Sequence, residues 1–231
     1  MMNKSLDITD VFFDLDHTLW DFERNSELTY HKIFKNYNLK IHLPDFLKVY
    51  VPNNTKLWGL YQLDKISKEE LRYQRLKMSF DQIGLSVTDH DIDLLADDYI
   101  KHLPSFNHLF KDATNILQYL KPKYNLHIIT NGFAEVQEGK LKNSGIAHYF
   151  DVIMDSEKAG VKKPNPLIFQ KAMDLANAVP KKSIMVGDNY EVDILGAKNV
   201  GMHTLYFNPL KPETDGTINQ IKGLIQIKNH L

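Results

Sequence analysis

The sequence predicts an α/β protein built on a parallel β-sheet, with a smaller helical module inserted after the first strand. Two observations support this prediction. Short apolar runs alternate with helix-like segments in the second half of the chain, and such alternation is typical of βαβ units, whose parallel strands are buried on both faces. A long stretch without a comparable strand candidate separates the first run from the others.

Five apolar runs are expected to form the strands of the sheet. They cover residues 11–13, 126–129, 150–154, 183–186 and 203–207. Helix-like segments at about residues 133–145, 165–178 and 190–200 connect the last four runs. This order of strands and helices is that of an open sheet with crossover helices.

The stretch of residues 20–103 is expected to be helical throughout. Residues 67–70 (SKEE) have the form of a capping box, and they open a helix that is expected to end near Gly84. Thr88 begins another helix, in which apolar side chains recur at spacings of three and four residues: Ile92, Leu95, Tyr99 and Leu103.

Two further helices are expected at residues 22–37 and 44–63, and the second of them is expected to be interrupted near Pro52. The chain therefore divides into a core domain and an inserted helical domain. The core is expected to comprise residues 1–20 and 104–231, and the helical domain residues 21–103.

The composition excludes several classes of protein. The 231 residues carry a net charge of −1, which offers no bulk attraction to a nucleic-acid polymer or an anionic membrane. The chain has no cysteine, which excludes disulfides, thiolate metal sites and cysteine nucleophiles. No apolar run approaches the roughly 18 residues of a membrane span. The first seven residues lack the apolar stretch of a secretory signal, so a cytoplasmic location is expected.

Polar residues follow several predicted strands, and in an open parallel sheet the carboxyl ends of the strands form the functional crevice. The first strand is followed by Asp14-Leu15-Asp16-His17-Thr18, the second by Thr130-Asn131-Gly132, and the fourth by Gly187-Asp188 with Asp193 five residues later. A loop before the helix at residue 165 adds Lys163-Pro164. Carboxylates, a hydroxyl group and a lysine are thus expected at one edge of the sheet.

These motifs, in this order, resemble the four motifs of the haloacid dehalogenase (HAD) superfamily of aspartyl-phosphate hydrolases. That family inserts an α-helical cap into its Rossmann-like core where this chain has its helical stretch. Four segments are also similar to a subgroup of bacterial 5′-nucleotidases that act on pyrimidine and non-standard nucleoside monophosphates. They are residues 12–19 (FFDLDHTL), 56–61 (KLWGLY), 128–133 (IITNGF) and 185–188 (MVGD). The resemblance covers almost the whole chain.

The resemblance implies a Mg²⁺-dependent phosphatase. Asp14 would be the nucleophile that forms an aspartyl-phosphate, and Asp16 would act first as general acid and then as general base. Asp14, Asp188 and the backbone carbonyl of Asp16 would hold the Mg²⁺, a cation that prefers oxygen ligands.

The resemblance also implies a set of phosphate-binding groups. Thr130 and Asn131 would donate hydrogen bonds to phosphate oxygens, and Lys163 would supply a fixed positive charge. Asp193 would orient Lys163 or a metal-bound water molecule. Thr18 and Gly132 are expected to line the phosphate as well.

The substrate is expected to be a small phosphorylated metabolite, most simply a nucleoside 5′-monophosphate. Proteins commonly hold a nucleobase on aromatic rings, and Phe22, Trp58 and Tyr61 are the aromatic residues nearest the expected substrate entrance. Trp58 and Tyr61 are three residues apart on one helical face, so they can equally pack inside the helical domain.

Other functions fit the sequence less well. A phosphatase of a sugar phosphate or of phosphoglycolate is the nearest alternative. A signalling receiver is about half this length and has no helical insertion. A dehalogenase lacks an acid–base carboxylate such as Asp16, and a catalytically inactive relative would have lost a motif residue. No pair among the ten histidines has the spacing and acidic partner of a metal site.

Overall fold

The computed structural model describes residues 7–209 and 218–231. Residues 1–6, on which the expected lack of a secretory signal partly depends, lie outside the described residues. No helix in the described part of the chain is long and apolar enough to cross a membrane.

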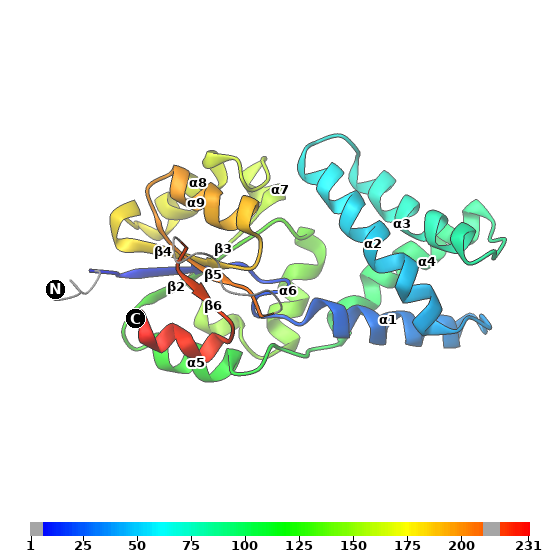
Figure 1. Ribbon diagram of the computed structural model, residues 1–231, viewed down its shortest axis with the longest axis horizontal. Helices are drawn as coiled ribbons and strands as arrows, with labels where there is room; N and C mark the ends of the chain where they lie inside the picture. The colour runs from blue at the N-terminus through cyan, green and yellow to red at the C-terminus, as the bar shows by residue number, and fades with distance from the viewer. Residues whose placement is uncertain (1–6, 210–217) are drawn as a thin grey trace. The chain divides into compact units, whose positions relative to one another are not determined.

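The described strands form one fully parallel sheet in the order β3-β2-β1-β4-β5-β6 (Figure 1), which confirms the predicted α/β class. They are β1 (Asp10–Phe13), β2 (Asn125–Thr130), β3 (Val152–Asp155), β4 (Ser183–Gly187), β5 (His203–Phe207) and β6 (Gln220–Ile221). The sequence did not predict β6, because two residues are too few to carry a periodic pattern.

The chain folds into two compact units. The first combines the residues up to Phe22 with those from Asn107 onward, and it contains the sheet. Its helices are α5 (Ala113–Leu120), α6 (Ala134–Asn143), α7 (Ser156–Ala159), α8 (Pro166–Ala176) and α9 (Gly196–Asn199). The π-helical turn η4 (Tyr190–Leu195) precedes α9. The short 3-10 segments of this unit are η2 (Ala147–Tyr149), η3 (Pro180–Lys182) and η5 (Leu224–Asn229), whereas η1 (Leu103–Ser105) belongs to the second unit.

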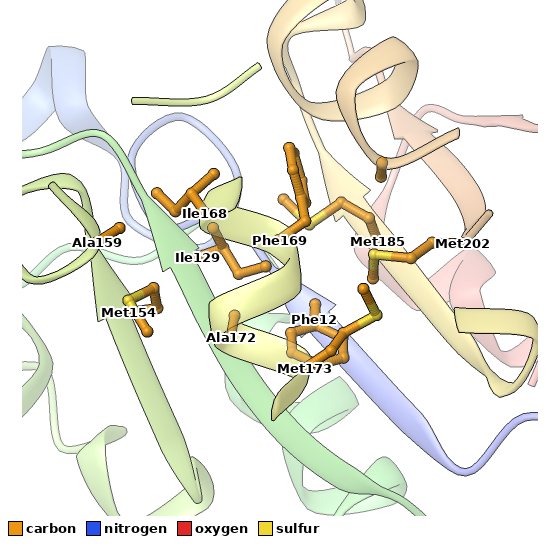
Figure 2. Packing of buried hydrophobic residues seen from close by; sticks show 11 residues of the cluster. Phe12, Ile129, Met154, Ala159, Ile168, Phe169, Ala172, Met173, Met185 and Met202 are labelled. Carbon is orange, nitrogen blue, oxygen red and sulfur yellow. The ribbon is translucent and has the colours of Figure 1, made fainter. Parts of the chain in front are cut away.

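Helices cover both faces of the sheet. On one face, Phe12 of β1 and Met185 of β4 pack against Phe169 and Met173 of α8 (Figure 2), and α9 lies beside α8 (Figure 1). Helix α5 and the C-terminal segment η5 lie on the opposite face (Figure 1). The strands are therefore buried on both sides, as the apolar runs in the sequence predict.

The second unit, Glu23–Phe106, is helical. It contains most of α1 (Phe22–Asn36), together with α2 (Leu43–Gln62), α3 (Lys68–Gln82) and α4 (Asp89–His102). The predicted capping box is present, because the Glu70 backbone N–H donates to Ser67 Oγ at 3.0 Å and the Ser67 N–H donates to Glu70 Oε2 at 2.8 Å. The core of this second unit is aromatic and includes five buried side chains: Tyr30, Phe46, Tyr50, Phe80 and Tyr99.

The predicted interruption at Pro52 is wrong, because α2 continues through this residue. Proline removes one backbone donor, which leaves the carbonyl of Lys48 without its helical partner. Both residues are exposed, so water can satisfy that carbonyl. The opposite side of α2 buries Phe46, Tyr50 and Leu57, and this packing stabilises the continuous helix.

A buried polar pair lies in the amino-terminal half of the sheet, away from the strand ends that carry the motifs. His127 Nε2 lies 3.1 Å from Asp10 Oδ1, and the two residues are 1% and 4% exposed. Burial lowers the pKa of His127, so the ring is neutral at pH 7 and donates this hydrogen bond. His127 Nδ1 has no hydrogen-bond partner among the described residues.

Candidate active site

The candidate site lies at the topological switch of the sheet. The chain passes from β1 to β2 and β3 on one side and then crosses to β4 on the other. Asp14 follows β1, and its backbone N–H donates to Val186 of β4 at 2.9 Å. Asp188 follows β4. The crevice between the carboxyl ends of two such strands is where open α/β sheets bind ligands.

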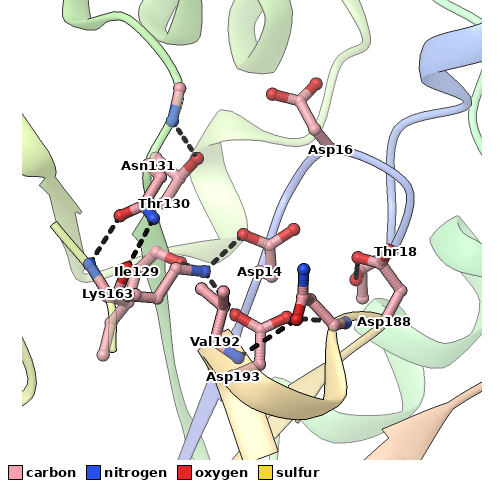
Figure 3. Close-up of polar contacts among 12 residues, drawn as sticks. Asp14, Asp16, Thr18, Ile129, Thr130, Asn131, Lys163, Asp188, Val192 and Asp193 are labelled. Atoms are coloured by element: carbon pink, nitrogen blue, oxygen red, sulfur yellow. Dashed lines mark hydrogen bonds and ion pairs between the residues drawn. The ribbon is translucent and has the colours of Figure 1, made fainter. Parts of the chain in front are cut away.

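Three carboxylates meet there (Figure 3). Asp14, Asp188 and Asp193 each offer an oxygen atom, and these oxygens lie within 4.8 Å of one another. Burial and the neighbouring carboxylates Asp193 and Asp188 raise the pKa of Asp14 well above its usual value. Burial and the charge of Asp193 raise the pKa of Asp188 to about 7.

Lys163 is the ammonium group inside this cluster. The residue is 1% exposed, and its Nζ donates to Asp14 Oδ1 at 2.6 Å, to Asp193 Oδ1 at 2.6 Å and to the Ile129 carbonyl at 2.8 Å. Burial alone would lower the pKa of Lys163, but the two carboxylates outweigh it and raise the pKa. Three carboxylates against one ammonium leave an excess of negative charge. A divalent cation with oxygen ligands fits this donor set.

Asn131 holds the backbone of Lys163. Its Oδ1 accepts from the Lys163 N–H at 2.7 Å, and its Nδ2 donates to the Lys163 carbonyl at 2.9 Å. Both ends of the Asn131 amide therefore contact the backbone of Lys163, and the expected contact of Asn131 with phosphate stays a prediction. Thr18 also contacts a site residue: it is 0% exposed, and its hydroxyl donates to Asp188 Oδ1 at 3.0 Å.

Asp193 lies within η4, and its side chain bonds to the residue that precedes this turn. Its Oδ2 accepts from the Asn189 backbone N–H at 3.1 Å, while its Oδ1 receives the Lys163 hydrogen bond described above. Gly187 leaves the necessary room, since an added Cβ there would collide with the Asp193 side chain. Asp193 therefore contacts the Lys163 ammonium directly, and its role in orienting Lys163 stays a prediction.

Thr130, at the end of β2, is 1% exposed. Its Oγ accepts from the Gly132 N–H at 3.0 Å and lies 3.3 Å from Gln137 Nε2, which donates to it. Asp16 lies apart from the Asp14–Lys163 pair (Figure 3). It contacts Lys140 and Gln137 of α6 instead.

Sequence reasoning did not find Lys140 or Gln137. Both are polar residues of a helix, and such residues are exposed in most proteins, yet each is only 2% exposed here. The available signal was their spacing of three residues, which places both on one face of α6.

The three predicted aromatic residues lie in different environments. Phe22 belongs to the first unit, is 6% exposed and packs against the rings of His17 and Trp20. Trp58 and Tyr61 lie on α2 of the helical unit, with ring centroids 5.5 Å apart and planes at 84°. Tyr61 is buried, and Trp58 is half-buried. The two rings contact each other, and the expected contact of Trp58 and Tyr61 with a nucleobase stays a prediction.

The fold and the motifs agree with a match to the family model for haloacid dehalogenase-like hydrolases, which covers residues 11–207. The chain belongs to this family of hydrolases. The prediction that it is an enzyme, a phosphoric monoester hydrolase, is confirmed by this match together with the relatives that follow.

Two curated relatives are pyrimidine 5′-nucleotidases. PynA of Streptococcus pneumoniae is 32% identical over 86% of this chain and 83% of its own length. YjjG of Escherichia coli is 31% identical over 86% of this chain and 85% of its own length. The crystal structure of the HAD-hydrolase YfnB from Bacillus subtilis, solved with magnesium bound, superposes with a TM-score of 0.86 at 25% identity, covering 96% of this chain and 97% of that chain.

Proposed function

We propose that the protein is a Mg²⁺-dependent phosphatase that hydrolyses nucleoside 5′-monophosphates through an aspartyl-phosphate on Asp14. One observation carries the proposal: the Asp14 carboxylate lies at the switch point of the sheet, 2.6 Å from a buried ammonium and beside a second strand-end carboxylate, Asp188. The similarity to two pyrimidine 5′-nucleotidases supports the choice of substrate class. The substrate is then a small cytoplasmic metabolite.

The chemistry proceeds in two steps. A carboxylate oxygen of Asp14 attacks phosphorus, and the bond from phosphorus to the ester oxygen breaks while Asp16 donates a proton to that oxygen. Water then attacks the aspartyl-phosphate and gives a proton to Asp16. The bond between phosphorus and Asp14 breaks, which releases inorganic phosphate and regenerates both carboxyl groups.

Fixed groups of this chain would bind the phosphoryl group during both steps. Lys163 contributes a positive charge that is already in place before the substrate arrives, so little reorganisation is needed in the transition state. The hydroxyl of Thr130 contributes a hydrogen bond. Asn131 holds the backbone of Lys163, and Asp193 accepts a hydrogen bond from its ammonium, so both residues position Lys163.

Asp14, Asp188 and the backbone carbonyl of Asp16 would hold the Mg²⁺. When bound, the cation neutralises the phosphate dianion, which otherwise repels an anionic nucleophile. Thr18 keeps Asp188 in position through its 3.0 Å hydrogen bond.

We assign the choice of the leaving group to the helical unit, which acts as a cap domain in this proposal. The sequence places this domain at residues 21–103, and the compact helical unit spans Glu23–Phe106. Chemistry at the phosphate is the same for every phosphomonoester, so selectivity must come from groups that contact the rest of the substrate. The half-buried Trp58 is the proposed contact for the base.

Phosphate release from a panel of nucleoside 5′-monophosphates, sugar phosphates and phosphoglycolate tests the proposal, with Mg²⁺ in one arm and EDTA in the other. Nucleoside monophosphates should be the best substrates, and EDTA should abolish turnover. Asp14→Asn should be inactive yet folded, because the amide has nearly the same shape but cannot attack phosphorus. Asp174→Asn, on the exposed side of α8, is the matched control. An active Asp14→Asn variant would exclude the covalent mechanism, and preference for a sugar phosphate would exclude the nucleotidase.

A further inference from the structure

A second buried lysine lies near the site, and the mechanism above does not use it. Lys140 of α6 is 2% exposed. Its Nζ lies 2.7 Å from Asp16 Oδ1 and 2.8 Å from Asp16 Oδ2, so one ammonium contacts both oxygens of the carboxylate. Lysine is almost never fully buried unless it is paired, and here the partner is the proposed acid–base residue.

Aromatic rings enclose the rest of this ammonium group. Lys140 Nζ lies 4.5 Å from the centroid of the Trp20 ring and 5.6 Å from that of Phe22. Both distances are within the range of cation–π attraction. The lysine is thus held between two aromatic faces and one carboxylate, which leaves its ammonium little freedom to move.

Gln137, one helical turn before Lys140, supplies a second donor to the same carboxylate. Its Nε2 lies 3.1 Å from Asp16 Oδ2 and 3.3 Å from Thr130 Oγ. Gly132 makes room for this amide, because an added Cβ would collide with Gln137 and would lie 3.0 Å from Asp16 Oδ2. Residue 132 of the strand-end motif must therefore be glycine for the Gln137 amide to reach Asp16.

The two motif aspartates are thus held by two different lysines. Asp14 pairs with Lys163 of the loop before α8, and Asp16 pairs with Lys140 of α6. The side chain of Asp16 is 19% exposed, so it remains accessible to a reacting group. A residue that donates and then accepts a proton must keep its carboxyl group in one orientation, and a misplacement of about 1 Å costs on the order of 10² in rate.

We propose that Lys140 is the positioning residue of Asp16, assisted by Gln137, and that it fixes the carboxyl group for proton transfer to and from the ester oxygen and water. This inference depends on the proposed phosphatase function. It assigns a role to two residues of α6 that lie outside the four motifs. Lys140 itself does not touch the substrate in this proposal.

Two esters with different leaving groups provide the test. Uridine 5′-monophosphate releases an alkoxide and needs a proton from Asp16, whereas p-nitrophenyl phosphate releases a stable phenolate and does not. Lys140→Met should therefore lower kcat/KM for the nucleotide at least tenfold more than for the nitrophenyl ester. KM should change little, because Asp14, Lys163 and Thr130 remain. Asp16→Asn should give the same pattern, and Lys140→Arg should recover part of the loss.

Lys142→Met is the matched control, since Lys142 is exposed on the same helix, and it should leave both activities unchanged. If Lys140→Met does not fold, Gln137→Met tests the same carboxylate and should show the same pattern more weakly. Thermal unfolding of Lys140→Met, Asp16→Asn and the double variant tests the contact without any assay of activity. The double variant should lose less stability than the sum of the two single variants.

The outcomes separate the inference from the function on which it depends. An equal loss on both esters would show that Lys140 only stabilises the fold, and unchanged or faster turnover would show that it holds Asp16 away from the substrate. Either result overturns the inference while the phosphatase function stands. A wild-type protein inactive on both esters would overturn the proposed function first, and the inference with it.

Discussion

Replacing Lys163 with methionine removes a buried charge from the centre of the site while nearly preserving the volume of the side chain. Lys163 is 1% exposed, and its ammonium has three acceptors, of which two are carboxylates at 2.6 Å. The variant therefore leaves Asp14 and Asp193 buried without their cation. Stability and catalysis should both suffer, for separate reasons.

The expected magnitudes follow from this environment. Removing one partner of a buried ion pair destabilises a protein by about 3–5 kcal/mol, because the remaining charge is uncompensated. For a chain of this size, 1 kcal/mol corresponds to about 2–4 °C, so Tm should fall by roughly 6–20 °C. Loss of a fixed donor to the transition state costs about 3–4 kcal/mol, or 10²–10³ in kcat.

Thermal unfolding by circular dichroism and steady-state phosphate release measure these two effects. Lys162→Met is the matched control, because it makes the same change at the preceding residue, which is half-buried whereas Lys163 is buried. It should lose well under tenfold in activity. If Lys162→Met were the more damaging change, or if Lys163→Met kept its Tm and its rate, Lys163 would not be the lysine that pairs with Asp14 and Asp193.

Three further predictions concern other parts of the chain. Gly132→Ala should lower both Tm and activity, because the added Cβ collides with the Gln137 amide. Gly59→Ala in α2 should instead raise the free energy of unfolding by about 0.5–1 kcal/mol, because nothing lies within 4 Å of the added Cβ. Thermal unfolding of both variants measures this difference. Burial lowers the pKa of His127, so the unfolded chain binds a proton that the folded chain does not, and the free energy of unfolding should decrease as pH falls below about 6.5. His127→Gln should weaken this dependence of the unfolding free energy on pH, as measured by urea titrations between pH 7 and 5. The same dependence in the variant would show that His127 is not its source. Trp58→Ala should raise KM for a nucleoside monophosphate and spare p-nitrophenyl phosphate, whereas an equal loss on both with a lower Tm would mean that the ring only packs within its unit.

Several elements followed from local patterns, and others did not. The capping box at Ser67 and the N-cap at Thr88 depend on residues three apart in the chain, so the sequence predicted both correctly. Helix α5 was missed although its buried residues recur at spacings of three and four, because it is only two turns long. The error at Pro52 has another origin: the residue breaks an isolated helix, and packing of the opposite face overrides that tendency.

The sequence by itself determined which groups gather at one edge of the sheet. Parallel strands bring their carboxyl ends together, so residues that follow the strands, such as Asp14, Thr130 and Asp188, share an edge whatever the details of packing. Order along the chain and residue type were enough for that inference. They were also enough to indicate the family.

Only the tertiary structure decided which of these groups contact one another. Asn131 and Thr18, both expected near the phosphate, contact Lys163 and Asp188, while Lys140 reaches Asp16 across 124 residues of sequence. Such pairings depend on the order of the strands and on which face of a helix turns inward. A lysine is ordinarily exposed, and no local pattern marks the one whose charge is buried against a carboxylate, because that burial is a property of the packed fold.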